Sequence, residues 1–355
     1  MYQYYVGLMG VDRRNFIRLI GFGSAAFYLP VNLRPQTSIN ALIKPPRLRE
    51  GDTVGVVNPA GPTFRKNDLK EVEKRLSRLG LNVVFGKHVL TQYGYLAGTD
   101  EERASDFNDM LNDQSVKAVI ATRGGWGSNR ILPLIDYDAI RRHPKILMGF
   151  SDITSLLLAI YVKTGMITFY GPVGTSKWGR FTTGWVKKIL FEGEQPTMSN
   201  PMTKLDGRPS DVHRIKTITS GTADGRLVGG NLSVISSMLG TGYLPDWRGK
   251  LLFFEEVDEK IYRIDRMLTQ LKLSGVLDRV SGIIIGKCVN CKISKTTLSM
   301  TLEEIFDDHL KPLGIPVYSG AMIGHIDRIF ILPIGVKARM NADKGTIELL
   351  ERSVT

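Results

Sequence analysis

The feature of the sequence that most constrains the fold is a regular alternation of strand-like and helix-like segments after Pro45-Pro46. Short β-branched or apolar runs predict strands at residues 53–58, 81–85, 116–122 and 145–150. Apolar residues at helical spacing predict helices at residues 66–79, 101–111 and 152–164. Strands joined by crossover helices pair in parallel, and helices cover both faces of such a sheet. The pattern therefore predicts an α/β domain with a parallel sheet over residues 46–172.

A second domain is predicted after a stretch that is rich in Gly, Pro and Thr. That stretch, residues 173–220, has weak periodicity and is typical of a linker with irregular excursions. Residues 221–355 then carry strand patterns at 250–255, 282–286, 317–318, 335–339 and 346–351, and helix patterns at 261–271 and 298–309. A chain of 355 residues is long enough for two domains, each with its own core.

The N-terminus has the features of an export signal. The pair Arg13-Arg14 is followed by an aromatic residue two positions on and by a moderately apolar run over residues 19–31. This arrangement resembles a twin-arginine signal, and the apolar run is too short for an ordinary membrane-spanning helix. Residues 37–41 offer a weak cleavage site, so we expect residues 1–45 to be an export signal and leader, and the mature protein to be periplasmic. The alternative is a buried amphipathic helix in a cytoplasmic protein.

The net charge of +12 does not by itself define a partner. A basic surface can attract nucleic acid or an anionic cell-wall polymer. Because zinc-finger spacing and basic runs interleaved with aromatics are both missing, we predict no nucleic-acid partner. The two cysteines, Cys288 and Cys291, supply only half the ligands of a structural zinc, so no metal or cofactor is predicted. Three interpretations of this pair stay open: an incidental pair, a disulfide formed outside the cytoplasm, and a redox motif.

The candidate nucleophile is Ser151, which lies between a predicted strand and a predicted helix. A sharp strand-to-helix turn exposes a serine at the edge of a sheet, and the amide of Asp152 would then face an oxyanion near the helix N-terminus. Serine is also a common helix N-cap at such a position. Upstream, the loop with Gly124 and Gly125 follows a buried strand and exposes backbone amides. This loop is a candidate second oxyanion donor or, alternatively, a phosphate cradle, although it lacks the usual phosphate-binding spacing.

A nucleophilic serine needs a base, and the base needs a carboxylate that orients it. Four of the five histidines lie in polar surroundings or in the predicted linker, namely His88, His143, His213 and His309. His325 instead follows Gly324 in a loop between two strand-like segments. Glu255 ends an apolar strand, with Glu256 as its nearest rival. Since Ser151 belongs to the first predicted domain and the other two to the second, we expect the active site between the domains.

Nine short motifs extend along the chain in a fixed order. In the first half they are Ala-Gly-Pro at 60–62, Ala-Gly-Thr-Asp-Glu-Glu-Arg at 97–103, Arg-Gly-Gly-Trp-Gly at 123–127 and Gly-Phe-Ser-Asp at 149–152. In the second they are Gly-Gly-Asn-Leu at 229–232, Glu-Glu-Val at 255–257, Tyr-Arg-Ile-Asp-Arg-Met-Leu at 262–268, Gly-His at 324–325 and Leu-Pro-Ile-Gly at 332–335. Together they resemble the LD-carboxypeptidase family of serine peptidases, which includes murein tetrapeptide carboxypeptidases and microcin C immunity peptidases. Two positions depart from the family pattern: Asn58-Pro59-Ala60 stands where Ala-Pro-Ser is frequent, and Trp126 where Tyr is commoner.

The resemblance implies a flavodoxin-like N-terminal domain of the class I glutamine amidotransferase type and a smaller C-terminal α/β domain of the swivelling type. It implies that Ser151 is the nucleophile, His325 the base and Glu255 the acid. It also implies an oxyanion hole made by the amide of Asp152 with that of Gly124 or Gly125. Relatives further suggest a homodimer.

The resemblance implies hydrolysis of an L,D-peptide bond that releases the terminal D-alanine of a peptidoglycan tetrapeptide through an acyl-enzyme. A second hypothesis keeps the triad but changes the substrate to a peptidyl-nucleotide antibiotic. The predicted export disfavours it, because that toxin acts in the cytoplasm. A third hypothesis is a non-catalytic protein that binds wall peptides.

Overall fold

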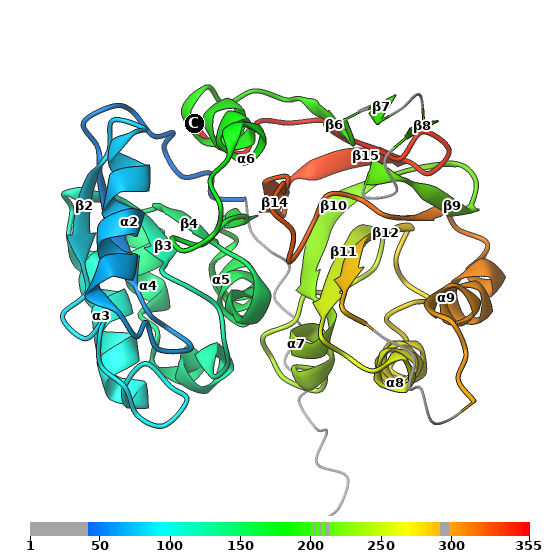
Figure 1. Cartoon of the computed structure of the whole chain (residues 1–355), viewed down its shortest axis with the longest axis horizontal. Helices are drawn as coiled ribbons and strands as arrows, with labels where there is room; N and C mark the ends of the chain where they lie inside the picture. The colour runs from blue at the N-terminus through cyan, green and yellow to red at the C-terminus, as the bar shows by residue number, and fades with distance from the viewer. Residues whose placement is uncertain (1–41, 202–203, 206–207, 210–212, 292–297) are drawn as a thin grey trace, which may run out of the picture. The chain divides into compact units, whose positions relative to one another are not determined.

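The computed structural model describes residues 42–201, 204–205, 208–209, 213–291 and 298–355 (Figure 1). The predicted export signal falls on residues 1–41, which lie outside the described residues. The last four residues of the predicted leader, 42–45, are joined to the folded body. The amide of Ile43 donates a hydrogen bond to the carbonyl of Gly165 at 3.0 Å. The amide of Thr355 donates one to the carbonyl of Pro45, also at 3.0 Å. Among the described residues, no helix combines the length and the apolar composition that a membrane span requires.

The first sheet is parallel except at one edge, which confirms the predicted parallel α/β fold. Its strand order is β14-β5-β4-β3-β1-β2, and only β14 runs antiparallel to its neighbour. The strands are β1 (Thr53–Val57), β2 (Asn82–Phe85), β3 (Val116–Ala121), β4 (Ile146–Gly149), β5 (Thr168–Tyr170) and β14 (Leu332–Ile334).

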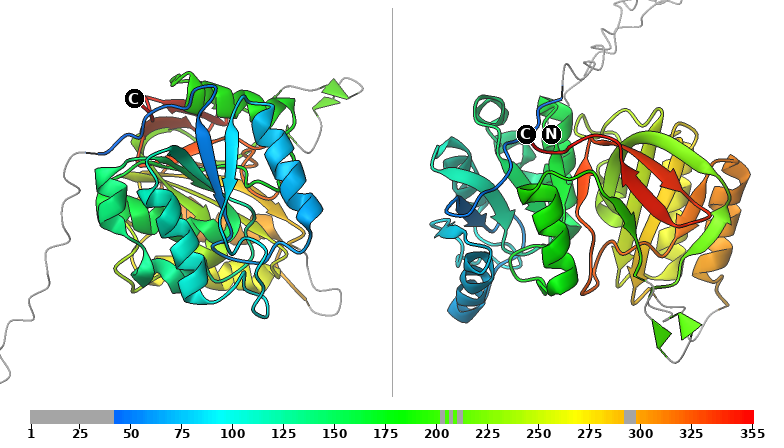
Figure 2. Two further views of the ribbon diagram at one scale, coloured as in Figure 1. Left: turned by 90° about the vertical axis from the view of Figure 1, so that its left-hand side faces the viewer. Right: turned by 90° about the horizontal axis from the view of Figure 1, so that it is seen from above.

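Helices cover both faces of this sheet (Figure 2). They are α2 (Lys66–Ser77), α3 (Asp100–Asn112), α4 (Tyr137–Arg142) and α5 (Thr154–Thr164). The chain passes outward from β1 to β2 and then back to β3, so right-handed crossovers place α2 and α3 on opposite faces. Helix α5 is buried on nearly all sides because it also contacts β10 and α7 of the second sheet domain. A helix in that position is expected to be apolar all round, as α5 is.

The second sheet has four parallel strands at its centre, β10 to β13, with antiparallel strands on both sides. Its order is β6-β16-β15-β10-β11-β12-β13-β9. The strands are β6 (Thr197–Ser199), β9 (Lys216–Thr219), β10 (Thr222–Asn231), β11 (Lys250–Val257), β12 (Gly282–Val289), β13 (Val317–Ser319), β15 (Lys337–Asn341) and β16 (Thr346–Leu349). Helices α7 (Leu232–Ser237), α8 (Ile261–Leu273) and α9 (Leu302–Leu310) pack side by side in a row, below the sheet in Figure 1.

The stretch 173–220 is not the irregular linker that its composition suggests. It contains α6 (Arg180–Val186), a π-helical turn over Lys187–Phe191, strands β6 and β9, and the short pair β7 (Lys204–Leu205) and β8 (Arg208–Pro209). Aromatic packing anchors α6, since the rings of Phe181 and Trp185 lie 5.7 and 5.3 Å from that of Phe330. These elements are too short to show a clear period, which is why the sequence pattern did not reveal them.

One strand joins the two halves of the chain. β14 pairs with β5 through Leu332 opposite Tyr170, so the first sheet takes a strand from residues that the sequence analysis places in the second domain. The chain then continues through Gly335 into β15 of the second sheet. Because β14 follows His325 closely, this pairing places the histidine loop beside the carboxyl ends of β4 and β5.

Candidate active site

Ser151 lies at the turn between β4 and α5, in a backbone conformation that is unusual for a residue with a side chain. A 3-10 turn over Ser151–Ile153 precedes α5, and Ser151 has a φ of 63°. Its carbonyl accepts a hydrogen bond from the Thr154 hydroxyl at 2.6 Å. The Ser151 hydroxyl does not cap the helix, as one interpretation of the sequence allowed, but faces His325. Strain of this kind at a serine between a strand and a helix is typical of a nucleophile turn.

Replacing Ser151 by glycine is expected to stabilise the protein relative to the alanine variant. Glycine adopts the left-handed conformation without the steric cost of about 1–2 kcal/mol that a Cβ atom brings, while its freer unfolded chain costs about 0.4–1 kcal/mol. The Ser151→Gly protein should therefore unfold with a free energy about 0.5–1 kcal/mol higher than Ser151→Ala. Urea unfolding of the two proteins measures this difference. A Ser151→Gly protein that is about 0.4–1 kcal/mol less stable than Ser151→Ala would show that the turn carries no strain.

The side chains of Ser151, His325 and Glu255 form a continuous hydrogen-bonded chain. His325 Nε2 lies 3.0 Å from Ser151 Oγ, and His325 Nδ1 lies 2.7 Å from Glu255 Oε2. The imidazole also packs on the ring of Phe150 at a centroid distance of 4.8 Å. Gly324, with a φ of 103°, has no room for a Cβ atom because one would overlap the Glu255 carboxylate. The Gly-His pair thus lets the histidine loop approach the acid closely enough for the short bond to form.

Glu255 is completely buried in β11, and its second oxygen is held by residues from both halves of the chain. Glu255 Oε1 accepts hydrogen bonds from the Tyr170 hydroxyl at 2.8 Å and from Asn231 Nδ2 at 3.2 Å. The alternative acid, Glu256, points elsewhere and accepts from the amide and the hydroxyl of Ser233 at 2.8 and 2.7 Å. Geometry therefore selects Glu255 as the partner of His325.

The environment of His325 makes it a stronger base than an ordinary histidine. Burial by itself lowers its pKa, but the hydrogen bond and the negative charge of Glu255 outweigh this effect and raise the pKa above the usual 6.5. Burial and the neighbouring Glu255 also raise the pKa of Tyr170 well above its ordinary value. Tyr170 therefore keeps its proton and donates a hydrogen bond to Glu255, while its oxygen accepts a hydrogen bond from the Ser151 amide at 3.3 Å.

The raised pKa of His325 predicts the acid limb of the pH profile. Only the neutral imidazole can accept the serine proton, so kcat/KM should fall as the pH decreases through a pKa above 6.5. Glu255→Gln removes the charge that favours the imidazolium, so this limb should move to lower pH while kcat also falls. Measuring kcat/KM from pH 5 to 9 for both proteins tests this. A limb that stays in place would mean that another group titrates.

Two segments that carry the candidate oxyanion donors lie close to each other, the nucleophile turn and the glycine loop. A Cβ atom on Gly124 would lie 2.9 Å from Ser151 Cβ and 3.6 Å from the amide nitrogen of Asp152. Gly125 faces the first turn instead, where a Cβ would lie 2.8 Å from Gly61 Cα. Of the two glycines that the sequence left open, Gly124 is therefore the one nearer the nucleophile. The Asp152 side chain turns away and accepts the Ser128 amide at 2.8 Å.

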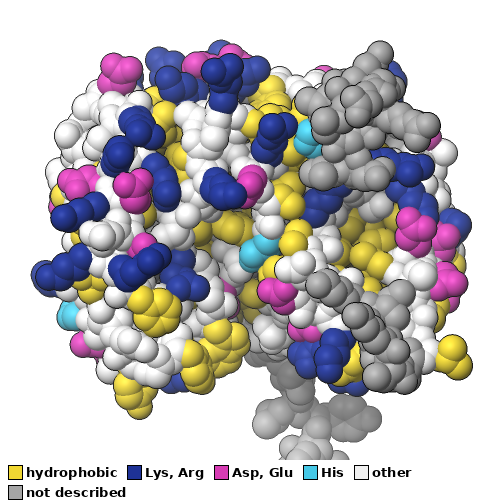
Figure 3. All heavy atoms as spheres, in the orientation of Figure 1, with side chains coloured by type: hydrophobic (Ala, Val, Ile, Leu, Met, Phe, Trp, Pro, Cys, Tyr) yellow, Lys and Arg dark blue, Asp and Glu magenta, His cyan; other side chains and the backbone are white. Residues whose placement is uncertain are grey.

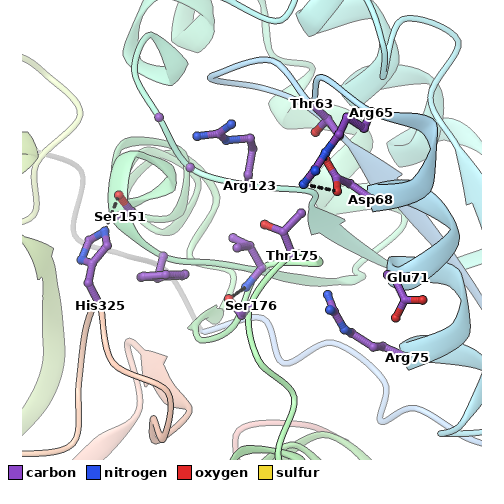
Figure 4. Close-up of a pocket in the computed structure, with 14 residues that line it drawn as sticks. Thr63, Arg65, Asp68, Glu71, Arg75, Arg123, Ser151, Thr175, Ser176 and His325 are labelled. Carbon is purple, nitrogen blue, oxygen red and sulfur yellow. Dashed lines mark hydrogen bonds and ion pairs between the residues drawn. The ribbon is translucent and has the colours of Figure 1, made fainter.

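A cavity of about 510 Å³ opens beside Ser151 and His325 (Figure 4). Its walls come from the first turn and α2, from the glycine loop, and from the segment after β5. The polar side chains that line it include Thr63, Arg65, Asp68, Glu71, Arg75, Arg123, Thr175 and Ser176. The candidate site is therefore an open, polar pocket with the serine–histidine pair at one end.

The other histidines show that a histidine–carboxylate pair alone does not make a site. His309 Nε2 lies 2.6 Å from Asp265 Oδ1, and His88 Nδ1 lies 2.8 Å from Asp106 Oδ1. Neither is hydrogen-bonded to a serine among the residues that the structure describes. His213 is not among the residues that line the pocket at Ser151.

Sequence reasoning did not assign roles to Tyr170 and Asn231, which hold Glu255. Asn231 lies in the Gly-Gly-Asn-Leu motif, where it also caps α7 by accepting the Val234 amide at 3.2 Å. The motif could therefore have marked Asn231 as a functional residue. Tyr170 ends a three-residue strand and has no local pattern that marks it.

The cysteine pair lies at the end of β12, the strand next to the one that carries Glu255. Cys288 is in β12 opposite Glu256, and Cys291 follows the left-handed Asn290; both thiols are free. No group of three or more His, Cys, Asp and Glu side chains in the described ranges is arranged as metal ligands.

A serine, an imidazole and a buried carboxylate in hydrogen-bonded sequence beside two backbone amides are the machinery of a serine hydrolase. Residues 54–171 match the LD-carboxypeptidase N-terminal domain and residues 224–340 match the LD-carboxypeptidase C-terminal domain. The chain belongs to the LD-carboxypeptidase family, as its motifs predicted.

The relatives cover most of the chain. A probable murein peptide carboxypeptidase of Bacillus subtilis is 42% identical over 307 residues, which is 85% of this chain and 93% of the relative. The microcin C7 self-immunity protein MccF of Escherichia coli is 33% identical over 86% of this chain and 95% of its own length. A solved structure of MccF without ligand has a TM-score of 0.79 at 31% identity, covering 88% of this chain and all of MccF. A muramoyltetrapeptide carboxypeptidase structure from Oxalobacter formigenes has a TM-score of 0.68 at 28% identity, covering 84% and 97%.

Proposed function

We propose that this protein is a serine L,D-carboxypeptidase that releases the terminal D-alanine from peptidoglycan tetrapeptides. The observation that carries the proposal is the hydrogen-bonded chain from Ser151 through His325 to Glu255. The substrate class is supported by the relatives that are named murein peptide or muramoyltetrapeptide carboxypeptidases.

The first half of the reaction follows from the positions of these groups. Ser151 Oγ attacks the carbonyl carbon of the scissile bond while His325 Nε2 takes its proton. The amides of Asp152 and Gly124 stabilise the negative charge that develops on the carbonyl oxygen. His325 then gives the proton to the nitrogen of the leaving amino acid, the carbon–nitrogen bond breaks, and an ester to Ser151 remains.

In the second half, water replaces the leaving amino acid. His325 takes a proton from the water, the hydroxide adds to the ester carbon, and Ser151 leaves with the proton returned to its oxygen. Glu255 stabilises the imidazolium through its hydrogen bond with His325 Nδ1. Tyr170 and Asn231 hold this carboxylate in place by donating to its other oxygen.

Purified protein incubated with a defined tetrapeptide tests the proposal. We expect mass spectrometry to detect free D-alanine and the tripeptide, and we expect Ser151→Ala to abolish both. A diastereomer that ends in L-alanine is the control and should stay intact. Failure to release D-alanine, or release by Ser151→Ala, would refute the assignment.

The similarity to MccF favours a second candidate substrate. MccF has been solved in complex with aspartyl sulfamoyl adenosine. Turnover of a peptidyl-nucleotide and of the tetrapeptide should be compared at equal concentrations. Faster turnover of the nucleotide would assign the protein to an immunity role.

A non-catalytic binding role is the remaining alternative. A fluorophosphonate probe labels only an activated serine, so labelling that Ser151→Ala abolishes excludes this role. No labelling of the wild-type protein would favour it.

We further propose that residues 1–41 direct the protein out of the cytoplasm through the Arg13-Arg14 pair. The proposal is supported by the adjacent arginines, the aromatic residue two positions on and the moderately apolar run over residues 19–31. Replacing both arginines by lysine should retain the protein in the cytoplasm, whereas Arg18→Lys, a nearby control, should not. Equal export of the two variants, measured by cell fractionation, would contradict the proposal.

A further inference from the structure

The pocket beside the nucleophile contains two arginines whose charges are not matched by a carboxylate. Arg65 pairs with Asp68 at 3.1 Å, and Glu71 lies 3.9 Å from Lys74. Within the described part of the chain, Arg75 and Arg123 form no ion pair. Because each of them is half-buried at the wall of a cavity, their charges favour an anionic ligand there.

Arg123 is held so that one edge of its guanidinium group stays available. Its Nη1 donates to the carbonyl of Pro62 at 3.0 Å, and its guanidinium carbon lies 5.8 Å from the centre of the Phe64 ring. Both contacts come from the first turn and fix the side chain. Nε and Nη2 donate no hydrogen bond to any described residue. These two groups form the edge with which arginine binds a carboxylate through two parallel hydrogen bonds.

The position of Arg123 in the chain places this edge close to the reacting bond. Arg123 directly precedes Gly124, the glycine that contacts Ser151 and whose amide we assign to the oxyanion hole. Figure 4 shows Arg123 between Ser151 and the first turn, with Arg75 farther away on the α2 side of the pocket. A C-terminal carboxylate is two bonds beyond the scissile nitrogen. The residue that binds it must therefore come from an element that touches the nucleophile, which is true of the Arg123 loop.

We propose that Arg123 binds the free C-terminal carboxylate of the substrate and thereby makes the enzyme a carboxypeptidase. The inference rests on the proposed function and names the group that recognises the leaving amino acid. A longer peptide, which continues beyond the amino acid that follows the scissile bond, has no carboxylate at this place. Its binding would bury the guanidinium edge of Arg123 without a hydrogen-bond partner. Arg75 contributes only to the general positive charge of the pocket. Figure 3 shows many Lys and Arg side chains on the side of the molecule that holds α2.

Two matched substrates separate specific recognition from general charge. One is a tetrapeptide that ends in D-alanine, and the other is the same peptide ending in D-alaninamide, which has no terminal charge. For the wild-type enzyme we expect kcat/KM to be about 100-fold higher on the acid, since a hydrogen-bonded ion pair is lost with the amide. Arg123→Ala should lower kcat/KM about 100-fold on the acid and less than about threefold on the amide.

Two further variants control the result. Arg123→Lys keeps the charge but not the two-pronged geometry, so it should recover only part of the activity on the acid. Arg75→Ala should lower activity on both substrates by similar, small factors. Circular dichroism and thermal unfolding check that each variant is folded.

The outcomes distinguish this inference from the proposed function. If the wild-type protein releases neither D-alanine nor D-alaninamide, the proposed function fails and the inference with it. If it hydrolyses the acid but Arg123→Ala weakens both substrates equally, only the inference is overturned. A selective loss in Arg75→Ala equal to that in Arg123→Ala would also overturn it, because the pocket would then recognise charge without a dedicated residue.

Discussion

Replacing His325 by alanine should lower kcat by about four to six orders of magnitude on a tetrapeptide substrate. Without the imidazole, Ser151 has no group to take its proton, since the Nε2–Oγ contact of 3.0 Å is its link to a base. The protein should remain folded, because His325 lies on a loop and is partly exposed. Single-turnover kinetics with a defined tetrapeptide measures the loss.

A matched control is available in His309. Its Nε2 lies 2.6 Å from Asp265 Oδ1, but among the described residues this histidine has no hydrogen bond to a serine. We expect His309→Ala to keep kcat within about a factor of three. The double variant Ser151→Ala/His325→Ala should be no slower than either single variant, because groups that act as a unit lose their effect together. A His325→Ala enzyme with more than a hundredth of the wild-type rate would contradict the assignment of His325 as the base.

Replacing Arg103 by methionine should destabilise the protein by about 3–5 kcal/mol. Arg103 is fully buried, and its Nη1 donates to the carbonyls of Pro59 at 2.6 Å and Gly127 at 2.9 Å, while its Nη2 pairs with Asp100. Methionine fills a similar volume but leaves both carbonyls without a donor. Urea unfolding measures the loss of stability.

Arg103 also joins the first turn to the end of the glycine loop. Its loss should therefore lower kcat in the protein that remains folded, because the Gly124 amide moves with that loop. Arg130→Met is the control: Arg130 binds the same Asp100 at 3.0 Å, but from the surface. It should scarcely change stability, since exposed ion pairs contribute little. Equal destabilisation by the two variants would show that Asp100 alone matters.

The alternation of strands and helices could be predicted because it depends on local pattern. Runs such as residues 116–122 and 145–150 are apolar since both faces of a parallel sheet are covered, and this signal does not need tertiary information. The helix beginning at Thr154 was predicted within two residues for the same reason. The fold class followed from these elements.

The candidate triad was only partly accessible from local sequence. The segment around Ser151 fits a helix cap as well as a nucleophile, and Glu255 has Glu256 beside it. What separates them is contact between residues 174 positions apart, His325 with Ser151, which no local pattern records. The triad was assigned from the order of the motifs that the chain shares with the LD-carboxypeptidase family. Tyr170 was missed because its role depends on a buried contact with Glu255, 85 positions away.

The short elements of residues 173–220 and the strand Leu332–Ile334 were missed or misplaced for a related reason. A three-residue strand has too few positions to show a period of two, and its partner is chosen by tertiary packing. β14 follows the histidine loop and pairs with β5, so it lies in the first sheet although its residues belong to the second half of the chain.

The return of β14 to the first sheet has a consequence for synthesis and for the exchange of parts. A nascent polypeptide cannot complete the edge of the sheet that bears its nucleophile until Ile334 has left the ribosome. By then His325 has emerged as well, so the serine acquires its base at nearly the same moment as its scaffold acquires its last strand. For the same reason, when halves from two relatives are fused between residues 173 and 220, the sheet of the first half would need a foreign β14 to fit its edge, and a gene fragment that ends there would lack this strand.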